Sequence, residues 1–223
     1  MGKLFTLNVF LLLINTSVLS QQYGSLKDPR DSKVYKTVKI GEQVWMAQNL
    51  DVSTFNNGDP IPQALSSEEW RQADKNKQPA WCYYWNDKSL SRKYGKLYNW
   101  YAVADPRGLA PKGFHIPTDS DWRKLYAFLG GIETAGYKLK NKTGWLDDGN
   151  GDNSVGFYGL AAGQRGDLGD CDFVSLGLSS FWWSTTEFKK DYAKVAFLFS
   201  YSKMVEHVPF SKGRGFSVRC IKN

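Results

Sequence analysis

The stretch Tyr94–Trp122, YGKLYNWYAVADPRGLAPKGFHIPTDSDW, decides how the rest of the chain is read. It is rich in aromatic side chains and ends in a helix start, where Thr118 precedes Asp121 by three residues, the spacing of a capping box. Beyond it, apolar residues recur at the helical period and define one face, formed by Trp122, Leu125, Tyr126 and Leu129. The sequence therefore predicts a helix that begins at Asp119 and ends at Gly130-Gly131, since glycine accepts the left-handed cap.

The segments on either side of this stretch differ in their periodicity. Residues 34–47 alternate in polarity around a Gly41-Glu42 turn, which predicts a β-hairpin. Ser66 and Glu69 predict the start of a second helix, and a further short helix is expected around 133–140. The later part of the chain predicts short strands, at 157–161, 181–185, 192–199, 204–210 and 216–221. A hairpin, two or more helices and then several short antiparallel strands make an α+β fold.

Several blocks along residues 34–221 resemble the Fibrobacter succinogenes major paralogous domain family. These blocks are WMAQNL at 45–50, GKLYNWYAV at 95–103, GFHIP at 113–117, GFYGLAAGQR at 156–165, FWWSTT at 181–186 and GFSVRC at 215–220. The resemblance implies a C-type-lectin-like fold, and most members of the family have no established activity. Members often carry a cysteine where this chain has Ala110, so the resemblance does not supply a disulfide pattern.

The first twenty residues have the pattern of a secretory signal, so three segments are expected. Lys3 precedes an apolar core, and small residues at Val18 and Ser20 place the cleavage site after residue 20. The apolar run is shorter than the ~20 residues of a spanning helix, and no cysteine follows the cleavage site. We expect a signal peptide at 1–20, a disordered polar leader at 21–33 and a single domain at 34–223. The mature chain is expected to be secreted, periplasmic or at the cell surface, without a transmembrane segment.

The chain carries 29 Lys and Arg against 22 Asp and Glu, a net charge of +7. Such a charge favours contact with acidic polymers or an anionic cell envelope. The basic residues are dispersed in small groups, of which Lys88, Arg92, Lys93 and Lys96 form one. This dispersal, in an exported protein, argues against a nucleic-acid partner.

The segment DDGNGDN at 147–153 is the candidate metal site. Asp147, Asp148, Asn150, Asp152 and Asn153 interleave with glycine, and calcium takes six to eight oxygen ligands of these types. The spacing is not that of an EF-hand, and a plain surface turn rich in Asn, Asp and Gly is the alternative. Calcium is therefore a possible cofactor.

The candidate ligand surface is formed by the long loops between Ala127 and Ser180. Trp145, Phe157 and Tyr158 could stack there on sugars or peptides, although most aromatic residues of such a chain pack in its core. The three cysteines, Cys82, Cys171 and Cys220, allow at most one internal disulfide, and the sequence leaves its pairing open.

Motifs of catalysis are weak in this chain. The two histidines, His115 and His207, are far apart in the sequence, and no G-x-S-x-G elbow or phosphate-binding glycine loop occurs. Enzymes of the related fold use a close pair of late cysteines, whereas this chain has the lone Cys220 near its end. We therefore expect a non-enzymatic binding module for an envelope polysaccharide or protein. The alternatives are an enzyme acting on an envelope polymer or secreted protein, and a structural or adhesion component.

Overall fold

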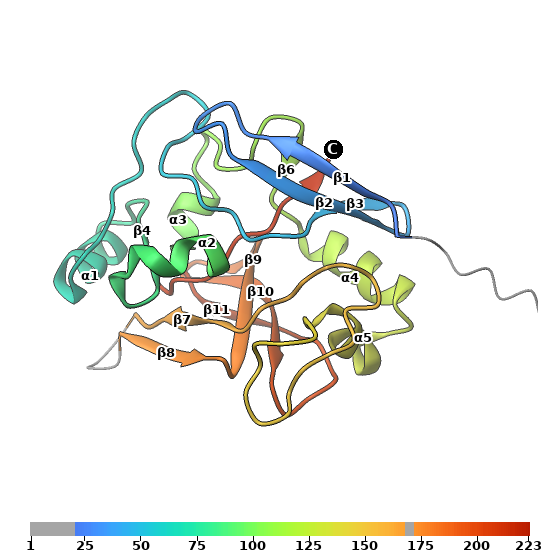
Figure 1. The fold of residues 1–223 in the computed structure, drawn as a ribbon. Helices are drawn as coiled ribbons and strands as arrows, with labels where there is room; N and C mark the ends of the chain where they lie inside the picture. The colour runs from blue at the N-terminus through green and yellow to red at the C-terminus, as the bar shows by residue number, and fades with distance from the viewer. Residues whose placement is uncertain (1–20, 168–171) are drawn as a thin grey trace, which may run out of the picture.

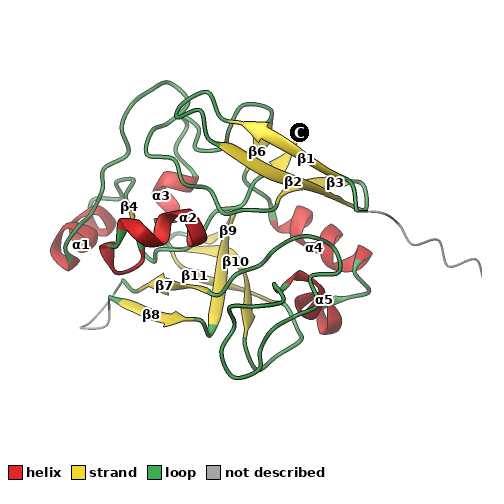
Figure 2. Ribbon diagram, viewed as in Figure 1, coloured by secondary structure: helices red, strands yellow, loops and turns green. Residues whose placement is uncertain are grey.

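The computed structural model describes residues 21–167 and 172–223, so the expected signal peptide and Cys171 lie outside the described part. Strands form two five-stranded sheets and one two-stranded pair. In the view of Figure 1, the sheet that contains the N-terminal hairpin lies above the other large sheet. Figure 2 shows helices α1, α2 and α3 at one side of the molecule and α4 and α5 at the other. The α+β architecture with mainly antiparallel strands agrees with the sequence analysis.

The first sheet joins the two ends of the domain. Its strand order is β1-β2-β3-β12-β6. The strands are β1 (Tyr23–Lys27), β2 (Val34–Ile40), β3 (Gln43–Met46), β12 (Ile221–Lys222) and β6 (Phe114–His115). The β2–β3 hairpin turns at Gly41, as expected, with φ of 60°. Ile221 lies opposite both Trp45 and His115, so the C-terminal strand is held between the hairpin and β6.

The second sheet has the order β11-β10-β9-β7-β8. Its strands are β11 (Glu206–Ser211), β10 (Tyr192–Phe199), β9 (Ser179–Lys189), β7 (Ala162–Arg165) and β8 (Phe173–Leu176). Strands β4 (Trp81–Cys82) and β5 (Leu97–Tyr98) form the separate pair. The strands expected at 181–185, 192–199 and 204–210 are confirmed.

Two of the expected strands are not formed as such. Residues 157–161 are a loop, because Phe157 and Gly159 take their places through contacts with distant segments and not through a ladder. Residues 216–221 make isolated bridges at Phe216 and Ser217, and regular pairing is limited to β12. In both segments the apolar sequence correctly indicates buried residues, but a buried segment need not form a strand.

Side-chain caps fix the starts of the two helices for which the sequence predicts capping boxes. The helices are α1 (Ser67–Lys75), α2 (Ser91–Tyr94), α3 (Trp100–Val103), α4 (Asp119–Phe128) and α5 (Ile132–Leu139), and 3-10 turns span Tyr84–Asn86 and Lys88–Leu90. Both expected capping boxes are present: Ser66 with Glu69, and Thr118 with Asp121. The apolar face of α4 is buried as the helical period predicts.

The expectation that residues 21–33 are disordered is wrong. Strand β1 pairs along its whole length with β2, from Tyr23 opposite Val38 to Lys27 opposite Val34. The turn that follows is anchored because the carboxylate of Asp28, fully buried, accepts hydrogen bonds from Arg30. The same guanidinium donates to the carbonyls of Thr54 and Leu109, at 2.9 Å each. Backbone pairing and a buried ion pair hold the segment, and neither leaves an apolar pattern in the sequence.

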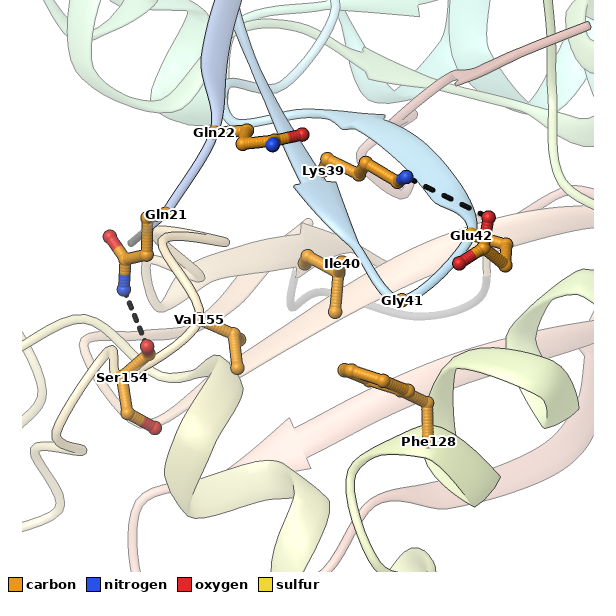
Figure 3. Close-up of a pocket in the computed structure, with 9 residues that line it drawn as sticks. All are labelled: Gln21, Gln22, Lys39, Ile40, Gly41, Glu42, Phe128, Ser154 and Val155. Atoms are coloured by element: carbon orange, nitrogen blue, oxygen red, sulfur yellow. Dashed lines mark hydrogen bonds and ion pairs between the residues drawn. The ribbon is translucent and has the colours of Figure 1, made fainter. Parts of the chain in front are cut away.

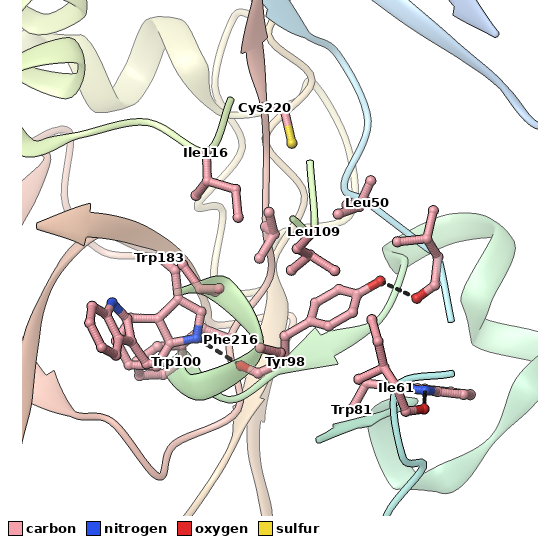
Figure 4. Close-up of a cluster of buried hydrophobic side chains, with 14 of the residues drawn as sticks. Leu50, Ile61, Trp81, Tyr98, Trp100, Leu109, Ile116, Trp183, Phe216 and Cys220 are labelled. Carbon is pink, nitrogen blue, oxygen red and sulfur yellow. Dashed lines mark hydrogen bonds between the residues drawn. The ribbon is translucent and has the colours of Figure 1, made fainter. Parts of the chain in front are cut away.

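Aromatic side chains with satisfied polar atoms build the first core cluster (Figure 4). The Tyr98 hydroxyl donates to the Val52 carbonyl at 2.7 Å, and the Trp183 indole N–H donates to the Tyr98 carbonyl at 2.7 Å. A buried aromatic ring stabilises the fold through its large apolar area, provided that its polar atom finds a partner. The YNWYAV part of the opening stretch is therefore the centre of this core.

A second core cluster lies between the hairpin, α4 and the middle of β9. Trp45, Trp122 and Trp182 meet there, with the Trp45 and Trp122 ring centroids 4.7 Å apart. Phe157 packs edge-on against Trp182, with the two ring centroids 5.6 Å apart.

Within the described residues, no helix has the length and apolarity needed to cross a membrane.

Cys82 and Cys220 are both buried free thiols, so the disulfide between them that the sequence left open is not formed. Burial raises the pKa of Cys82 to about 11 and raises the pKa of Cys220 still further. Because the thiolate is the reactive form, we expect iodoacetamide at pH 8 to leave both residues unlabelled in the folded protein and to label both in denaturant. Peptide mass mapping measures this, and rapid labelling of either thiol in the folded state would contradict the burial.

Candidate functional site

A pocket of about 250 Å³ opens beside the β2–β3 hairpin. Residues of β2, helix α2 and the segment after β3 line it, together with the loop after Phe157 and the C-terminal segment that carries Arg219. It is lined by Lys36, Ala47, Gln48, Asn49, Arg92, Lys93, Tyr158, Leu160 and Arg219. We call it the Arg219 pocket, because the buried guanidinium of Arg219 is its most unusual wall.

Arg219 is 1% exposed and is held by neutral groups alone. Its Nη2 donates to the side-chain oxygen of Asn49 at 2.8 Å, and its Nε donates to the same oxygen at 3.2 Å. Its Nη1 donates to the Phe157 carbonyl, and Nη2 also approaches the Tyr158 carbonyl at 3.4 Å. The guanidinium carbon lies 4.1 Å from the centre of the Phe157 ring, a cation–π distance.

Asn49 orients this guanidinium, although it lies far from Arg219 in the sequence. Its amide nitrogen donates to the Tyr94 carbonyl at 2.9 Å and to the Ser217 hydroxyl at 3.1 Å. Its oxygen also accepts the indole N–H of Trp182 at 2.9 Å. Asn49 is 7% exposed, and its donors and its acceptor are all used, so both its position and its amide orientation are fixed.

The positive charge of Arg219 has no carboxylate partner among the described residues. Burial lowers the pKa of Arg219 to about 9, so the group still carries most of its charge at neutral pH. A buried charge without a counter-ion is costly, because the hydrogen bonds of neutral groups replace only part of its hydration. An anion that enters the pocket would supply the missing charge.

Three further cations surround the mouth of the pocket. Lys36 projects from β2, and Arg92 and Lys93 lie in the last turn of α2; all three are exposed. No described carboxylate forms an ion pair with any of them. Gly95 ends α2 with φ of 73°, and a Cβ there would lie 2.7 Å from the Leu50 carbonyl oxygen. The glycine therefore lets the end of α2 approach the segment that carries Asn49.

Tyr158 stands at the mouth with an uncommon backbone conformation, φ of 55°. The Asn153 side-chain oxygen accepts its backbone N–H at 2.8 Å, which helps to hold this left-handed geometry. The side chain is 40% exposed. Strained backbone at a pocket is a pointer to function when the surroundings enforce it, as they do here.

The predicted ligand-binding aromatics are divided by the structure. Tyr158 is exposed at the pocket, but Trp145 is 4% exposed and Phe157 is fully buried, so the interpretation of these two as exposed stacking platforms is wrong. The Trp145 indole N–H donates to the Gly159 carbonyl at 2.9 Å, which explains its inward position. The Phe157 ring instead packs against the buried guanidinium of Arg219.

Three of the five predicted calcium ligands are engaged by backbone N–H groups of their own loop. The side-chain oxygens of Asn150 and Asp152 accept the backbone N–H groups of Trp145 and Ser154, at 3.1 and 2.9 Å. Asn153 is committed to Tyr158. Asp147 and Asp148 are exposed. In residues 21–167 and 172–223, no group of three or more His, Cys, Asp or Glu side chains is arranged to hold a metal ion.

A larger pocket, of about 340 Å³, lies beside the β2–β3 turn (Figure 3). Ile40, Phe128 and Val155 form its apolar side, and Gln21 donates to the Ser154 carbonyl at its edge. Its Lys39 and Glu42 face each other at 3.7 Å, so those charges compensate each other. We place the candidate site at the smaller pocket, because the uncompensated charges are there.

Sequence reasoning missed most residues of the Arg219 pocket. Arg92 and Lys93 were recognised only as part of a basic group, and Lys36, Asn49 and Arg219 were not singled out. One signal was available: Arg219 is the only charged residue within the apolar run 216–221. A charged residue in such a run either forms an ion pair in the interior or binds a ligand, and the sequence alone does not distinguish the two.

Comparison with known proteins supports one statement of kinship. The model of the Fibrobacter succinogenes major domain matches residues 38–222, nearly the whole of the described chain. The protein belongs to this family. All the lining residues of the Arg219 pocket except Lys36 lie within the matched region. No curated protein and no solved structure matches the chain.

Three of the five candidate calcium ligands, Asn150, Asp152 and Asn153, are engaged by backbone N–H groups of the loop. We therefore expect calcium and EDTA to give the same melting temperature for residues 21–223. A calcium ion present at a hundred times its dissociation constant would add ~2.7 kcal/mol. That would raise the melting temperature by roughly 5–10 °C in a chain of this size. A calcium-dependent rise that disappears in Asp147→Asn/Asp148→Asn would contradict this reading and restore the calcium site.

Proposed function

We propose that the protein is an exported, non-enzymatic binding module that acts at the cell envelope or outside the cell and holds an anionic group of its ligand in the Arg219 pocket. The observation that carries the proposal is the buried guanidinium of Arg219, which has neutral partners only and borders a pocket ringed by three more cations. Preorganised donors in a partly buried site bind an anion at low reorganisation cost, because Asn49 already holds the guanidinium in place.

The alternative of an enzyme is less well supported by the same pocket. A glycosidase-type or nucleophilic mechanism needs a carboxylate pair or a reactive thiol in a cleft. The residues that line the Arg219 pocket include neither, and Cys82 and Cys220 are buried elsewhere. A structural or adhesion role based on an intermolecular disulfide would depend on Cys171, which lies outside the described residues.

We also propose that the fold is C-type-lectin-like. The support is the pairing of β12 with β3, which joins the two ends of the domain in one sheet, together with helices α4 and α5 and the long loop between α5 and the second sheet. An experimental structure compared strand by strand with a lectin-like domain tests this assignment, and a different strand order would exclude it.

Export is proposed from the sequence of residues 1–20. Intact-mass measurement of the protein recovered from the medium or periplasm of the producing cell should show Gln21 as the first residue. Recovery of the full-length chain from the cytoplasm alone would overturn the proposed compartment.

The pocket is tested with sulfate as the probe anion, at constant ionic strength against chloride. We expect sulfate to raise the melting temperature of the unmodified protein by several degrees more than that of the triple variant Lys36→Gln/Arg92→Gln/Lys93→Gln, since each kcal/mol of binding corresponds to roughly 2–4 °C.

The matched control is Lys75→Gln/Lys77→Gln/Lys142→Gln, which removes the same charge at exposed sites away from the pocket. It also corrects for the general stabilising effect of sulfate on folded proteins. Equal sulfate shifts in the two triple variants would exclude anion binding at this pocket.

A further inference from the structure

We propose that the anionic group recognised by the Arg219 pocket is the carboxylate of a uronic acid residue within an acidic polysaccharide. This inference rests on the proposed function, that the pocket is the binding site, and adds the chemical class of the ligand. Four features of the pocket support it: its volume, its walls, the arrangement of its cations and the state of its backbone.

The volume exceeds the needs of a simple oxyanion. The pocket measures about 250 Å³, whereas one water occupies roughly 30 Å³ in the liquid. A phosphate or sulfate ion alone would therefore leave most of the space to solvent. A six-membered sugar ring that carries a carboxylate would fill it while its charged end approaches Arg219.

The walls are suited to a ring with one apolar face and one polar edge. The exposed side chain of Tyr158 and the half-buried side chain of Leu160 supply apolar surface in the lining of the same pocket as Arg219. The C–H face of a sugar packs well on such surface, and an aromatic ring with a polar tip tolerates neighbouring hydroxyl groups. Gln48 is exposed at the same mouth, where its side-chain nitrogen can donate to a hydroxyl.

The cations occupy two positions relative to the pocket. Arg219 is buried at its floor, whereas Lys36, Arg92 and Lys93 are exposed at its rim. A polyuronate carries one carboxylate on every residue, so a chain with one residue in the pocket brings neighbouring charges to the rim. The rim cations would add attraction and speed of association, and salt would weaken their effect.

The backbone around the pocket favours a saccharide over an extended peptide. A peptide that adds a strand needs unpaired N–H and C=O groups along an edge. At this position the Lys36 N–H donates to the Gln48 side chain at 2.8 Å, and the Lys36 carbonyl accepts the Ala47 N–H at 2.8 Å. The backbone groups of Lys36, a residue that lines the pocket, are thus already used.

The test is calorimetric titration of residues 21–223 with a trigalacturonate at low salt. Its fully methyl-esterified form, a neutral trisaccharide, inorganic phosphate and a short poly-glutamate serve as competing probes. We expect binding of the acidic trisaccharide and a loss of at least about tenfold on esterification, because a neutral ester cannot compensate Arg219.

Variants locate the binding without disturbing the buried network. The rim triple variant Lys36→Gln/Arg92→Gln/Lys93→Gln should bind the acidic trisaccharide about tenfold more weakly, since exposed charges contribute modestly one by one. The control Lys75→Gln/Lys77→Gln/Lys142→Gln should bind as the unmodified protein does. Tyr158→Ala should weaken binding and Tyr158→Phe should not; both keep a Cβ, so the backbone strain at position 158 is the same in the two variants.

The outcomes separate this inference from the function on which it rests. If phosphate binds in a rim-dependent way and trigalacturonate does not, the pocket is an anion site and the uronate assignment is overturned. Equal binding of the methyl ester would overturn recognition of the carboxylate. If poly-glutamate binds more tightly through the same rim residues, the ligand is an acidic protein segment. If no anion distinguishes the rim variant from its control, both the inference and the proposed function are wrong.

Discussion

The side-chain oxygen of Asn49 links segments of the domain that are far apart in the sequence. It accepts hydrogen bonds from Arg219, near the end of the chain, and from Trp182 in the middle of β9. The amide nitrogen of the same residue reaches the end of α2 and the Ser217 hydroxyl. Loss of this one amide would leave several buried donors without partners, and each such donor costs about 1–3 kcal/mol. The relative positions of the hairpin, α2, β9 and the C-terminal segment therefore depend on it.

This junction carries a charge that the protein interior compensates only in part. Carbonyl and amide oxygens satisfy the hydrogen-bonding geometry of Arg219, and the rings of Phe157 and Trp182 lie 4.1 and 5.5 Å from its guanidinium carbon. Elsewhere in the described chain, Arg30 has Asp28 and Lys96 has Asp51 as carboxylate partners, whereas the buried Lys140 donates only to the carbonyls of Ser200 and Ser202. Arg219 differs from Lys140 because it lines a pocket that three further cations also line. An accessible site with an uncompensated charge is the expected design of an anion receptor.

Local signals in the sequence were sufficient for the elements that depend on local interactions. The capping boxes at Ser66 and Thr118, the period of α4 and the glycine turn of the hairpin each specify their structure within a few residues. Strand β1 escaped prediction because it is held by backbone pairing and by an ion pair at Asp28. The Arg219 pocket escaped because it joins residues far apart in the chain, such as Lys36, Arg92 and Arg219. Composition records their charges, but only the fold brings them to one place.

The loop that the sequence marked as a ligand surface contributes to the site in a different way from the one expected. Phe157 was expected to face a ligand, and it instead supports the guanidinium that would do so. Asn153 was expected to bind a metal, and it instead fixes the backbone of Tyr158. Aromatic and amide side chains such as Phe157 and Asn153 can contact a ligand, and they can equally hold neighbouring residues in place. The sequence does not separate these two roles, because both require a defined side-chain position and satisfied polar atoms. The loop thus adds one exposed aromatic side chain, Tyr158, to a pocket that is also lined by one buried charge, Arg219, and this combination gives the pocket its chemical character.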